Sequence, residues 1–537
     1  MRLPADSEPP IGCRQPLPRY PPIWAKSRQE VCETWDWFRS YQGGVYFRQN
    51  EAKGYLLSAF SSKRDGWFHN GKLIISHGGG KAESIHHTKG HLEKQAASDQ
   101  NAEDFSVRAL LKNFRNNIPV ALLIDDKYVH FPFSLDARDV AYAVLGFYKI
   151  THVWSELQPA NNDRGRVVRY KFAFQWYESQ GQPWWCSTPE DLPTTSKPNP
   201  NHFFGSVYQE CSDCRHMSPQ VYEIGWMCLQ SECRRFWVID TSDAVLLEQL
   251  KYNPAFLELL PNLTLPVTLS IFPPSPPSVL ESTVTTTELF ARGWHCTKCG
   301  RLSCRYTWQL WECAHCKNSL RVQGAIQHAR DLQGESKKSS MMAIDAGHLK
   351  LSFFLMTRTL FSMKDDRISC LNRGFVHRIK GCGVGMNQEA NKIFIKYQEE
   401  AMEGKLLFRR WPLRAVSRGE LLTHYFSQNS KCTLAIILPP YQYVGGTENT
   451  VPWDQAPSAV IEARALMQHR IKLALDDTCE SEFNEVLSAA YMQKQKMAGD
   501  ILVMQGADIQ RCYEHTVEPS NFRIAATARY IAPNTLA

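Results

Sequence analysis

The sequence predicts a multidomain α+β protein with a β-rich N-terminal part, two small zinc modules and a C-terminal part of strands and helices. Three observations predict this class. The chain has 537 residues, about three to four times the length of a typical domain. Its 43% of hydrophobic and 21% of charged residues are typical of a folded chain rather than a disordered one. Eight of its 17 cysteines fall into two groups of four with the spacing of metal ligands.

The N-terminal part begins with a proline-rich segment, 1–27, that we expect to be disordered. The following residues, 28–186, contain short runs of apolar and β-branched residues, which are typical of strands. Three such runs are Lys72–Ser76, Pro119–Ile124 and Val167–Phe174. We therefore predict a β-rich domain over residues 28–186.

Two segments, 203–240 and 292–321, each carry four cysteines in two close pairs, with a Pro/Thr-rich linker at 272–288 between them. The pairs are Cys211 with Cys214, Cys228 with Cys233, Cys296 with Cys299, and Cys313 with Cys316. Four thiolates are the usual ligands of a tetrahedral zinc ion, and they leave no open position for a substrate. The sequence therefore predicts two structural Zn²⁺ sites. Two alternatives stay open: reduced core cysteines without metal, or a ligand exchanged for Cys304, His216, His295 or His315.

The second cysteine segment, 292–321, also mixes cations with aromatic residues, which suits phosphate contact and base stacking. The cations are Arg292, Lys298, Arg301, Arg305, Lys317 and Arg321, and the aromatic residues are Trp294, Tyr306, Trp308 and Trp311. The alternative is that these aromatic residues form the small core of the module. The first segment, 203–240, is balanced in charge, so we expect it to be a structural clip between domains.

The partner and the compartment follow from charge and from cysteine use. The net charge of +7 favours a polyanion, so we expect DNA or RNA as the partner. Met1 to Cys13 contains no apolar run of a secretory signal, and no stretch of about 18 uncharged apolar residues occurs in the chain. Close cysteine pairs of this kind are typical of a reducing compartment. We expect an intracellular, nuclear protein without a membrane partner.

The C-terminal part is predicted to hold one long amphipathic helix and two late strands. Asp454 and Pro457 supply a cap residue and a first-turn proline. Apolar residues then recur at helical spacing, namely Val460, Ile461, Met467, Ile471 and Leu475. Strand-like runs follow at Asp500–Met504 and Arg523–Ile531.

Two motif-bearing stretches within 370–533 resemble the AlkB-like branch of the Fe(II)- and 2-oxoglutarate-dependent dioxygenases, of the fungal type. They are Phe483–Tyr491 (FNEVLSAAY), and Gly499–Met504 (GDILVM) followed by Tyr513–His515 and Arg523–Arg529 (RIAATAR). The resemblance implies a double-stranded β-helix, or jelly roll, with flanking helices. It also implies Fe²⁺ and 2-oxoglutarate as cofactors, and oxidative removal of a modification from nucleic acid.

The same resemblance implies roles for four residues. His515 corresponds to the distal iron ligand, in a 2-His-1-carboxylate triad that leaves positions open for 2-oxoglutarate and O₂. Arg523 corresponds to the arginine that pairs with the distal carboxylate of 2-oxoglutarate, and Arg529 to a second arginine of that pocket. Tyr491 corresponds to a hydroxyl donor to 2-oxoglutarate. Ala489 stands where the family usually has asparagine.

The family's His-x-Asp pair is missing from this sequence. None of the 17 histidines is followed two residues later by aspartate, and Met497 runs through Ala498 directly into Gly499. Two of the three iron ligands therefore have no candidate, and the jelly roll is expected to be incomplete, with unpaired strand edges. Two explanations stay open. The chain is a truncated or mis-spliced form of an active oxygenase, or it is a non-catalytic, zinc-containing nucleic-acid- or chromatin-binding protein.

The N-terminal part resembles the SRA (YDG) domains in the order and spacing of six short segments. These are Gly78–Lys81, Asp99–Gln100, Arg108–Asn113, Pro119–Val120, Tyr142–Leu145 and Val167–Phe172. The resemblance implies an SRA-like β-barrel that reads a flipped modified cytosine. Asp139–Tyr142 replaces the Tyr-Asp-Gly element of that family, and a barrel that serves only protein contacts is the alternative. His86, His87 and His91 lie in a polar run that we expect to be a solvated loop.

Overall fold

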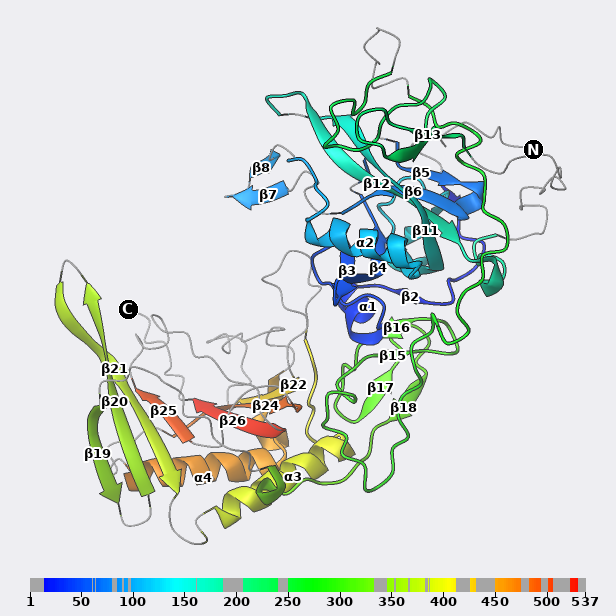
Figure 1. The fold of residues 1–537 in the computed structure, drawn as a ribbon. Coiled ribbons are helices and arrows are strands. Elements are labelled where there is room, and N and C mark those ends of the chain that lie inside the picture. The colour runs from blue at the N-terminus through cyan, green and yellow to red at the C-terminus, as the bar shows by residue number, and fades with distance from the viewer. Residues whose placement is uncertain are drawn as a thin grey trace. The chain divides into compact units, whose positions relative to one another are not determined.

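The computed structural model divides into two compact units. The first contains residues 1–274 and 295–303, and the second contains residues 275–294 and 304–537 (Figure 1). The structure describes residues 14–59, 61–62, 64–79, 85–88, 91–94, 98–160, 162–186, 206–239, 250–332, 345–351, 354–365, 368–381, 385, 387–411, 425–430, 450–474, 482–493, 501–505 and 522–529. None of the helices within these ranges is both long enough and apolar enough to cross a bilayer.

The first unit is built on a mixed sheet of eight strands. Seven of them follow the order β3-β4-β9-β11-β12-β6-β5, and β2 pairs with β11 off this path. Strands β4 and β9 run parallel, and the other neighbours run antiparallel. The bounds are β2 Trp24–Ala25, β3 Val45–Arg48, β4 Glu51–Leu57, β5 Gly66–Phe68, β6 Leu73–His77, β9 Val120–Asp125, β11 Tyr142–Pro159 and β12 Arg166–Trp176. The three runs predicted to be strands form β6, β9 and β12, so those predictions are confirmed.

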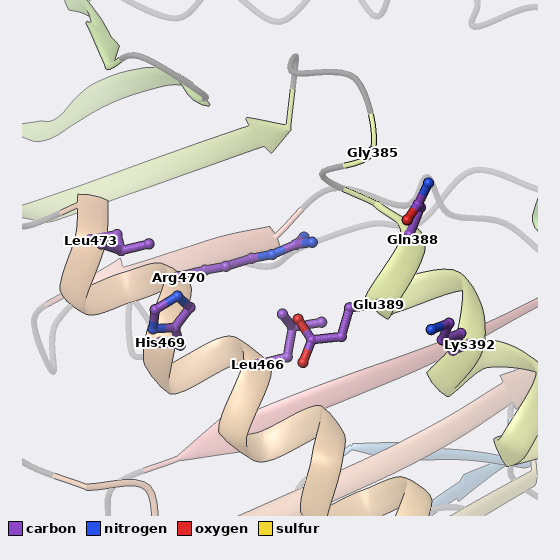
Figure 2. A pocket seen from close by; sticks show the side chains of 8 residues that line it. All are labelled: Gly385, Gln388, Glu389, Lys392, Leu466, His469, Arg470 and Leu473. Carbon is purple, nitrogen blue, oxygen red and sulfur yellow. The ribbon is translucent and has the colours of Figure 1, made fainter.

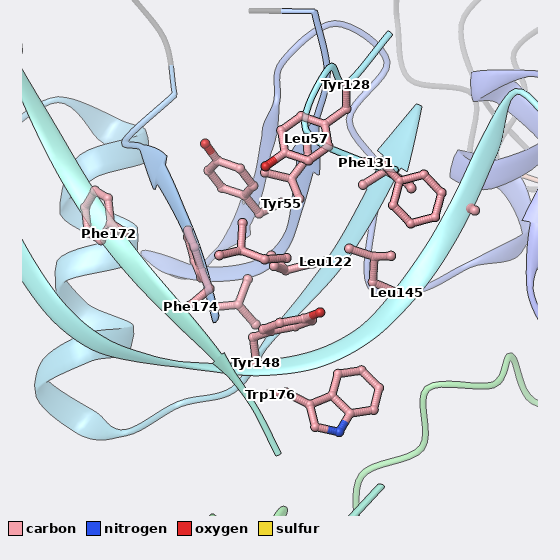
Figure 3. Close-up of a cluster of buried hydrophobic side chains, with 14 of the residues drawn as sticks. Tyr55, Leu57, Leu122, Tyr128, Phe131, Leu145, Tyr148, Phe172, Phe174 and Trp176 are labelled. Carbon is pink, nitrogen blue, oxygen red and sulfur yellow. The ribbon is translucent and has the colours of Figure 1, made fainter. Parts of the chain in front are cut away.

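Two helices complete this unit. Helix α1, Arg28–Thr34, begins at a capping box in which Ser27 and Glu30 satisfy each other's backbone N–H groups. Helix α2, Phe105–Asn116, ends at Asn117 in a left-handed conformation and packs on β3, β4 and β11. Its buried Leu110 belongs to the main apolar cluster, in which Tyr55, Tyr148 and Phe174 lie around Leu122 (Figure 3).

The predicted β-barrel does not close. Strands β3 and β5 stand at the two ends of the sheet order, and no ladder joins them within the described residues. The three residues of β5 pair only with β6 among the described strands, so the sheet remains open at that edge. The loop predicted around His86 is also wrong, because β7, Ile85–Thr88, and β8, His91–Lys94, form an antiparallel hairpin.

Among its described residues, the second unit contains two sheets of four strands, two α-helices and the short pair β17-β18. One sheet has the order β19-β20-β21-β25, and the other has the order β23-β22-β24-β26. Their bounds are β19 Asp345–Leu351, β20 Phe354–Asp365, β21 Ile368–Gly381, β22 Tyr425–Ser430, β23 Thr450–Pro452, β24 Glu485–Tyr491, β25 Ile501–Gln505 and β26 Arg523–Arg529. The short strands elsewhere are β1 Gln15–Pro16, β10 Phe133–Ser134, β13 Tyr208–Glu210, β14 Met217–Pro219, β15 Trp294–His295, β16 Leu302–Ser303, β17 Leu310–Glu312 and β18 Ser319–Arg321.

Helices α3, Gln388–Glu403, and α4, Ser458–Ala474, pack with the second of these sheets around one core, which contains Tyr397, Val460 and Val486. The predicted C-terminal helix is therefore confirmed, although Ile461 points to solvent. The two late runs form β25 and β26, as predicted. The jelly roll stays a prediction, because no ladder between described strands joins the two sheets.

Candidate functional site

Each of two clusters brings four cysteine sulfur atoms within 4.8 Å of one another. One cluster consists of Cys211, Cys214, Cys228 and Cys233, and the other of Cys296, Cys299, Cys313 and Cys316. In the first cluster, the sulfur atoms of Cys211 and Cys233 are 3.7 Å apart, as are those of Cys214 and Cys228. Zn–S bonds of about 2.3 Å in a tetrahedron place the sulfur atoms about 3.8 Å apart. Both sets therefore have the ligand number and the compactness that could hold a zinc ion.

The alternative ligands do not enter these clusters. Within the described ranges, the two four-cysteine sets are the groups of three or more His, Cys, Asp or Glu that could hold a metal. Neither set includes His216, His295 or His315. Cys304 is buried and belongs to neither set. The geometry thus favours the all-cysteine sets over an exchanged ligand.

Three of the four cysteine pairs are closed by the same backbone turn. The carbonyl of the first cysteine accepts a hydrogen bond from the residue after the second cysteine, which has a positive φ. These residues are Arg215 (2.9 Å, φ 60°), Gly300 (2.8 Å, φ 79°) and Lys317 (2.9 Å, φ 60°). Such a turn aims N–H groups at sulfur, and the N–H groups of Cys214 and Asp213 lower the pKa of Cys211 to about 7. Burial raises the pKa of Cys228 and of Cys233 in the same cluster, so those two thiols would ionise only with a bound metal ion to stabilise the thiolates.

The turn at Cys296–Cys299 is held by the N-terminal segment of the same unit. The indole N–H of Trp24 donates to the carbonyl of Cys299 at 2.7 Å, and the backbone N–H of Trp24 donates to the carbonyl of Gly300 at 3.1 Å. A Cβ at position 300 would lie 2.6 Å from the carbonyl oxygen of Pro22. Close backbone approach and a positive φ therefore both require glycine here.

A buried ion pair braces the same turn. Nη2 of Arg301 lies 2.7 Å from Oε1 of Glu30, and the two side chains are 6% and 1% exposed. The other carboxylate oxygen of Glu30 accepts the backbone N–H groups of Lys26 and Ser27. The Arg301 guanidinium also lies 5.5 Å from the ring centroid of Trp24. Glu30 and Trp24 are not among the site residues predicted from the sequence, although the Ser-x-x-Glu capping box was a signal for Glu30.

The stacking surface predicted over 292–321 is not present. Trp294, Trp308 and Trp311 are all buried. Trp308 belongs to the core of the second unit, where its ring centroid lies 5.2 Å from that of Tyr425. Arg305 is buried as well, with its guanidinium 5.6 Å and 5.5 Å from the ring centroids of Trp308 and Trp311. It donates to the carbonyl of Phe290 at 2.9 Å. Half of the predicted phosphate contacts remain at the surface, namely Lys298, Lys317 and Arg321.

The first cysteine segment packs on strands β6, β11 and β12 of the N-terminal sheet. The hydroxyl of Tyr222 donates to Oε2 of Glu156 on β11 at 2.6 Å, and Trp154 donates to that hydroxyl at 3.2 Å. Glu156 is fully buried and pairs with Arg64 at 2.7 Å. The backbone N–H of Ser155 donates to the carbonyl of Leu229, between two of the cysteines. These contacts attach the first cluster to strand β11.

A second buried ion pair lies within the N-terminal sheet. Nζ of Lys171 on β12 is 2.5 Å from Oδ1 of Asp65 and 2.8 Å from the hydroxyl of Ser62. Nδ1 of His77 is 3.3 Å from the other oxygen of Asp65. Burial acts to raise the pKa of Asp65, but Lys171 and His77 outweigh it and hold that pKa below its usual range. No pattern in the sequence pointed to this pair.

In the C-terminal sheet, Tyr491 of β24 lies directly opposite Arg523 of β26. The guanidinium carbon of Arg523 is 4.4 Å from the ring centroid of Tyr491. All three guanidinium nitrogens are buried, and none has a hydrogen-bond partner among the described residues. Burial lowers the pKa of Arg523 to about 10. A buried guanidinium with unused donors is chemically suited to a carboxylate.

The other residues implied by the oxygenase resemblance cannot be compared with this point, because His515 and the side chain of Arg529 lie outside the described residues. Arg529 is at the far end of β26, opposite Glu485, and its side chain lies outside the described residues. His515, the implied iron ligand, also lies outside them, as do Gly499 and Tyr513. Among the implied residues whose side chains are described, the structure brings together Tyr491 and Arg523.

A cavity of about 350 Å³ lies between α3 and α4 (Figure 2). Arg470 of α4 and Glu389 of α3 extend into the space between the helices. Burial lowers the pKa of Arg470, while the nearby charge of Glu389 raises it. None of the site residues predicted from sequence lines this cavity.

Comparison with known proteins gives little beyond these observations. No family model matches the sequence. No curated protein matches it either. Among solved structures, an SRA domain of SUVH5 in complex with methylated CHH DNA has 16% identity and a TM-score of 0.21, over 30% of this chain and 92% of that chain. KRYPTONITE in complex with mCHG DNA and SAH has 18% identity and a TM-score of 0.22, over 34% of this chain and 37% of that chain. Likenesses at this level carry no argument about the site.

Proposed function

We propose that this chain is a zinc-containing nucleic-acid-binding protein of the nucleus, in which two zinc ions have structural roles. The observation that supports this most strongly is the pair of clusters, each with four sulfur atoms within 4.8 Å of one another. Cys211–Cys214, Cys296–Cys299 and Cys313–Cys316 are closed by one kind of turn, which is the usual way to build such a site. Four thiolates complete a tetrahedron, so the ion would stabilise the fold and not activate a substrate.

Nucleic acid is the partner that the charges favour. The chain has a net charge of +7. Lys298 and Arg321 are exposed beside the second cluster, where they are free to contact phosphate oxygens. Lys317 is exposed too, although it pairs with Glu312 at 3.2 Å. The buried aromatic residues of this segment would support the phosphate contacts without stacking on bases.

The first test counts zinc and measures binding. We expect two zinc atoms per chain by mass spectrometry of the purified protein, and binding of a labelled oligonucleotide that weakens steeply with salt. Cys296→Ser is expected to lose one zinc, whereas Cys304→Ala, at a cysteine outside the clusters, is expected to keep both. Fewer than two zinc atoms in the parent, or binding that does not depend on salt, would contradict the proposal.

Arg523 favours a second candidate function, the binding of a dicarboxylate such as 2-oxoglutarate. Its guanidinium is buried, has no hydrogen-bond partner among the described residues and lies over the ring of Tyr491. The oxygenase resemblance implies that both residues bind 2-oxoglutarate. The missing His-x-Asp pair leaves iron without two ligands, so we propose binding without oxygenase chemistry. Calorimetry with 2-oxoglutarate should show binding that Arg523→Met abolishes. An anaerobic titration with Fe²⁺ and 2-oxoglutarate should show no charge-transfer band, and such a band would establish the oxygenase instead.

A further inference from the structure

Two phenylalanine side chains lie exposed and stacked on the first unit. Phe105, the first residue of α2, is 68% exposed, and Phe47 of β3 is 36% exposed. Their ring centroids are 6.4 Å apart, and the ring planes differ by 19°. Figure 1 shows α2 beside the hairpin of β3 and β4, which carries Phe47. Neither ring contributes to the buried core, so folding alone does not explain a stacked aromatic pair at this position.

Cations lie on the helix and the hairpin that carry this pair. The guanidinium of Arg108 lies 5.2 Å from the ring centroid of Phe105. Lys112 and Arg115 follow Arg108 at the spacing that places residues on one side of a helix, and Arg48 comes directly after Phe47. We call these six residues the Phe47–Phe105 platform: Phe47, Arg48, Phe105, Arg108, Lys112 and Arg115.

The acids nearby do not neutralise the platform. Glu51 lies 3.2 Å from Lys112 and also pairs with Lys53, and Glu103 lies 3.6 Å from Arg108. Arg48 and Arg115 are exposed and form no ion pair with a described residue. Asp104, the N-cap residue directly before Phe105, is a third acid. The four cations Arg48, Arg108, Lys112 and Arg115 therefore exceed Glu51, Glu103 and Asp104 by one charge.

The platform is also rigid. The hairpin turns at Gln49 and Asn50, which both have the positive φ of a two-residue turn. The buried amide of Asn113 on α2 accepts from the backbone N–H of Ala52 and donates to its carbonyl, both at 2.8 Å. Lys112 donates to the carbonyl of Gln49 at 3.3 Å. Helix and hairpin thus hold the two rings in place before any partner arrives, which lowers the entropic cost of binding.

We propose that the Phe47–Phe105 platform binds single-stranded nucleic acid, with bases stacked on the rings and phosphates paired with the cations. Exposed rings stack on any base, and flanking cations follow the backbone, so this combination suits a single strand. In a duplex the base faces are already stacked and cannot reach the rings. This inference rests on the proposed nucleic-acid function. It adds the surface that binds and the preference for single strands over duplexes.

The test uses the full chain with a fluorescein-labelled 20-nucleotide single strand and a duplex of the same length, measured by fluorescence anisotropy. Phe47→Ala with Phe105→Ala should weaken single-strand binding by about tenfold or more, and should change duplex binding less than about twofold. Arg48→Gln with Arg115→Gln should lower the salt slope of single-strand binding by about 1.4, the value for two phosphate contacts. Tyr208→Ala, at another exposed aromatic residue of this unit, is the matched control and should change neither.

The outcomes separate this inference from the function on which it rests. If the parent binds single strands and the double phenylalanine variant binds them equally well, the platform is refuted and the nucleic-acid function stands. If the parent binds neither oligonucleotide, both fail. Equal losses for single strand and duplex would overturn the assignment to single strands. Far-UV circular dichroism and zinc content establish that each variant is folded, as expected for substitutions at exposed rings.

Discussion

Breaking the ion pair between Arg301 and Glu30 is expected to destabilise the first unit strongly. The two residues are 271 positions apart in sequence, with a 2.7 Å contact and almost no exposure of either side chain. Arg301→Met leaves the buried Glu30 carboxylate without its guanidinium partner, although it still accepts the backbone N–H groups of Lys26 and Ser27. Removing one partner of such a buried pair costs about 3–5 kcal/mol, whereas an exposed pair is worth about 0–1 kcal/mol.

The assay is urea-induced unfolding of the full chain, followed by tryptophan fluorescence, with released zinc recorded by a colorimetric chelator. We expect the transition that releases zinc to move down by about 1 M urea or more in Arg301→Met. Glu30→Gln should show a similar loss. The double variant should recover much of it, because a neutral pair leaves no uncompensated charge.

The exposed pair between Lys317 and Glu312, in the same cysteine segment, is the matched control. Glu312→Gln should shift the transition by less than about 1 kcal/mol. The reasoning is refuted if Arg301→Met costs no more than this control. It is also refuted if the effects of Arg301→Met and Glu30→Gln simply add in the double variant.

Three further predictions concern the clusters and the buried carboxylate. Cys211→Ser should reduce the zinc content from two atoms per chain to one, and two retained atoms would exclude Cys211 as a ligand. Gly300→Ala should lower the free energy of unfolding by more than about 1 kcal/mol and weaken zinc binding at the second cluster, because the added Cβ would collide with the Pro22 carbonyl. Competition with a chelator measures the zinc affinity, and unchanged zinc retention would contradict this prediction. The lowered pKa of Asp65 means that its stabilising contribution is complete above the unfolded value of about 3.9 and is lost as pH falls through the lower folded value. In Asp65→Asn, the free energy of unfolding should therefore fall less steeply than in the parent between about pH 4 and 2, as measured by circular dichroism. An unchanged pH dependence would show that Lys171 does not stabilise the ionised form of Asp65.

Features of the molecule that depend on neighbours in sequence could be predicted well. Short runs of apolar and β-branched residues predicted β6, β9 and β12, and apolar residues at helical spacing after Pro457 predicted α4. The Cys-x2-Cys spacing predicted turns that the structure shows at Cys211, Cys296 and Cys313. In each case the information lies within a few residues, because a strand's period, a cap and a turn are local.

Burial and long-range pairing could not be predicted in this way. Composition suggested that Trp308, Trp311 and Arg305 would face nucleic acid, yet all three are buried, and Trp308 belongs to the core of the second unit. The same residue types occur on an exposed face and in a buried core, and only tertiary packing distinguishes the two. The exposed pair Phe47 and Phe105 was missed for the converse reason, since isolated phenylalanines in sequence predict core positions.

By itself, the sequence determined the cysteine sets, three of the eight strands of the N-terminal sheet and the missing His-x-Asp pair. Only the tertiary structure decided that Trp24 and Glu30 brace a cysteine turn about 270 residues away. It also decided that the sheet stays open and that Arg523 keeps unused donors opposite Tyr491. The physical reason is range: spacing and period act between neighbours, whereas burial, ion pairing and sheet closure depend on which distant segments the folded chain brings together.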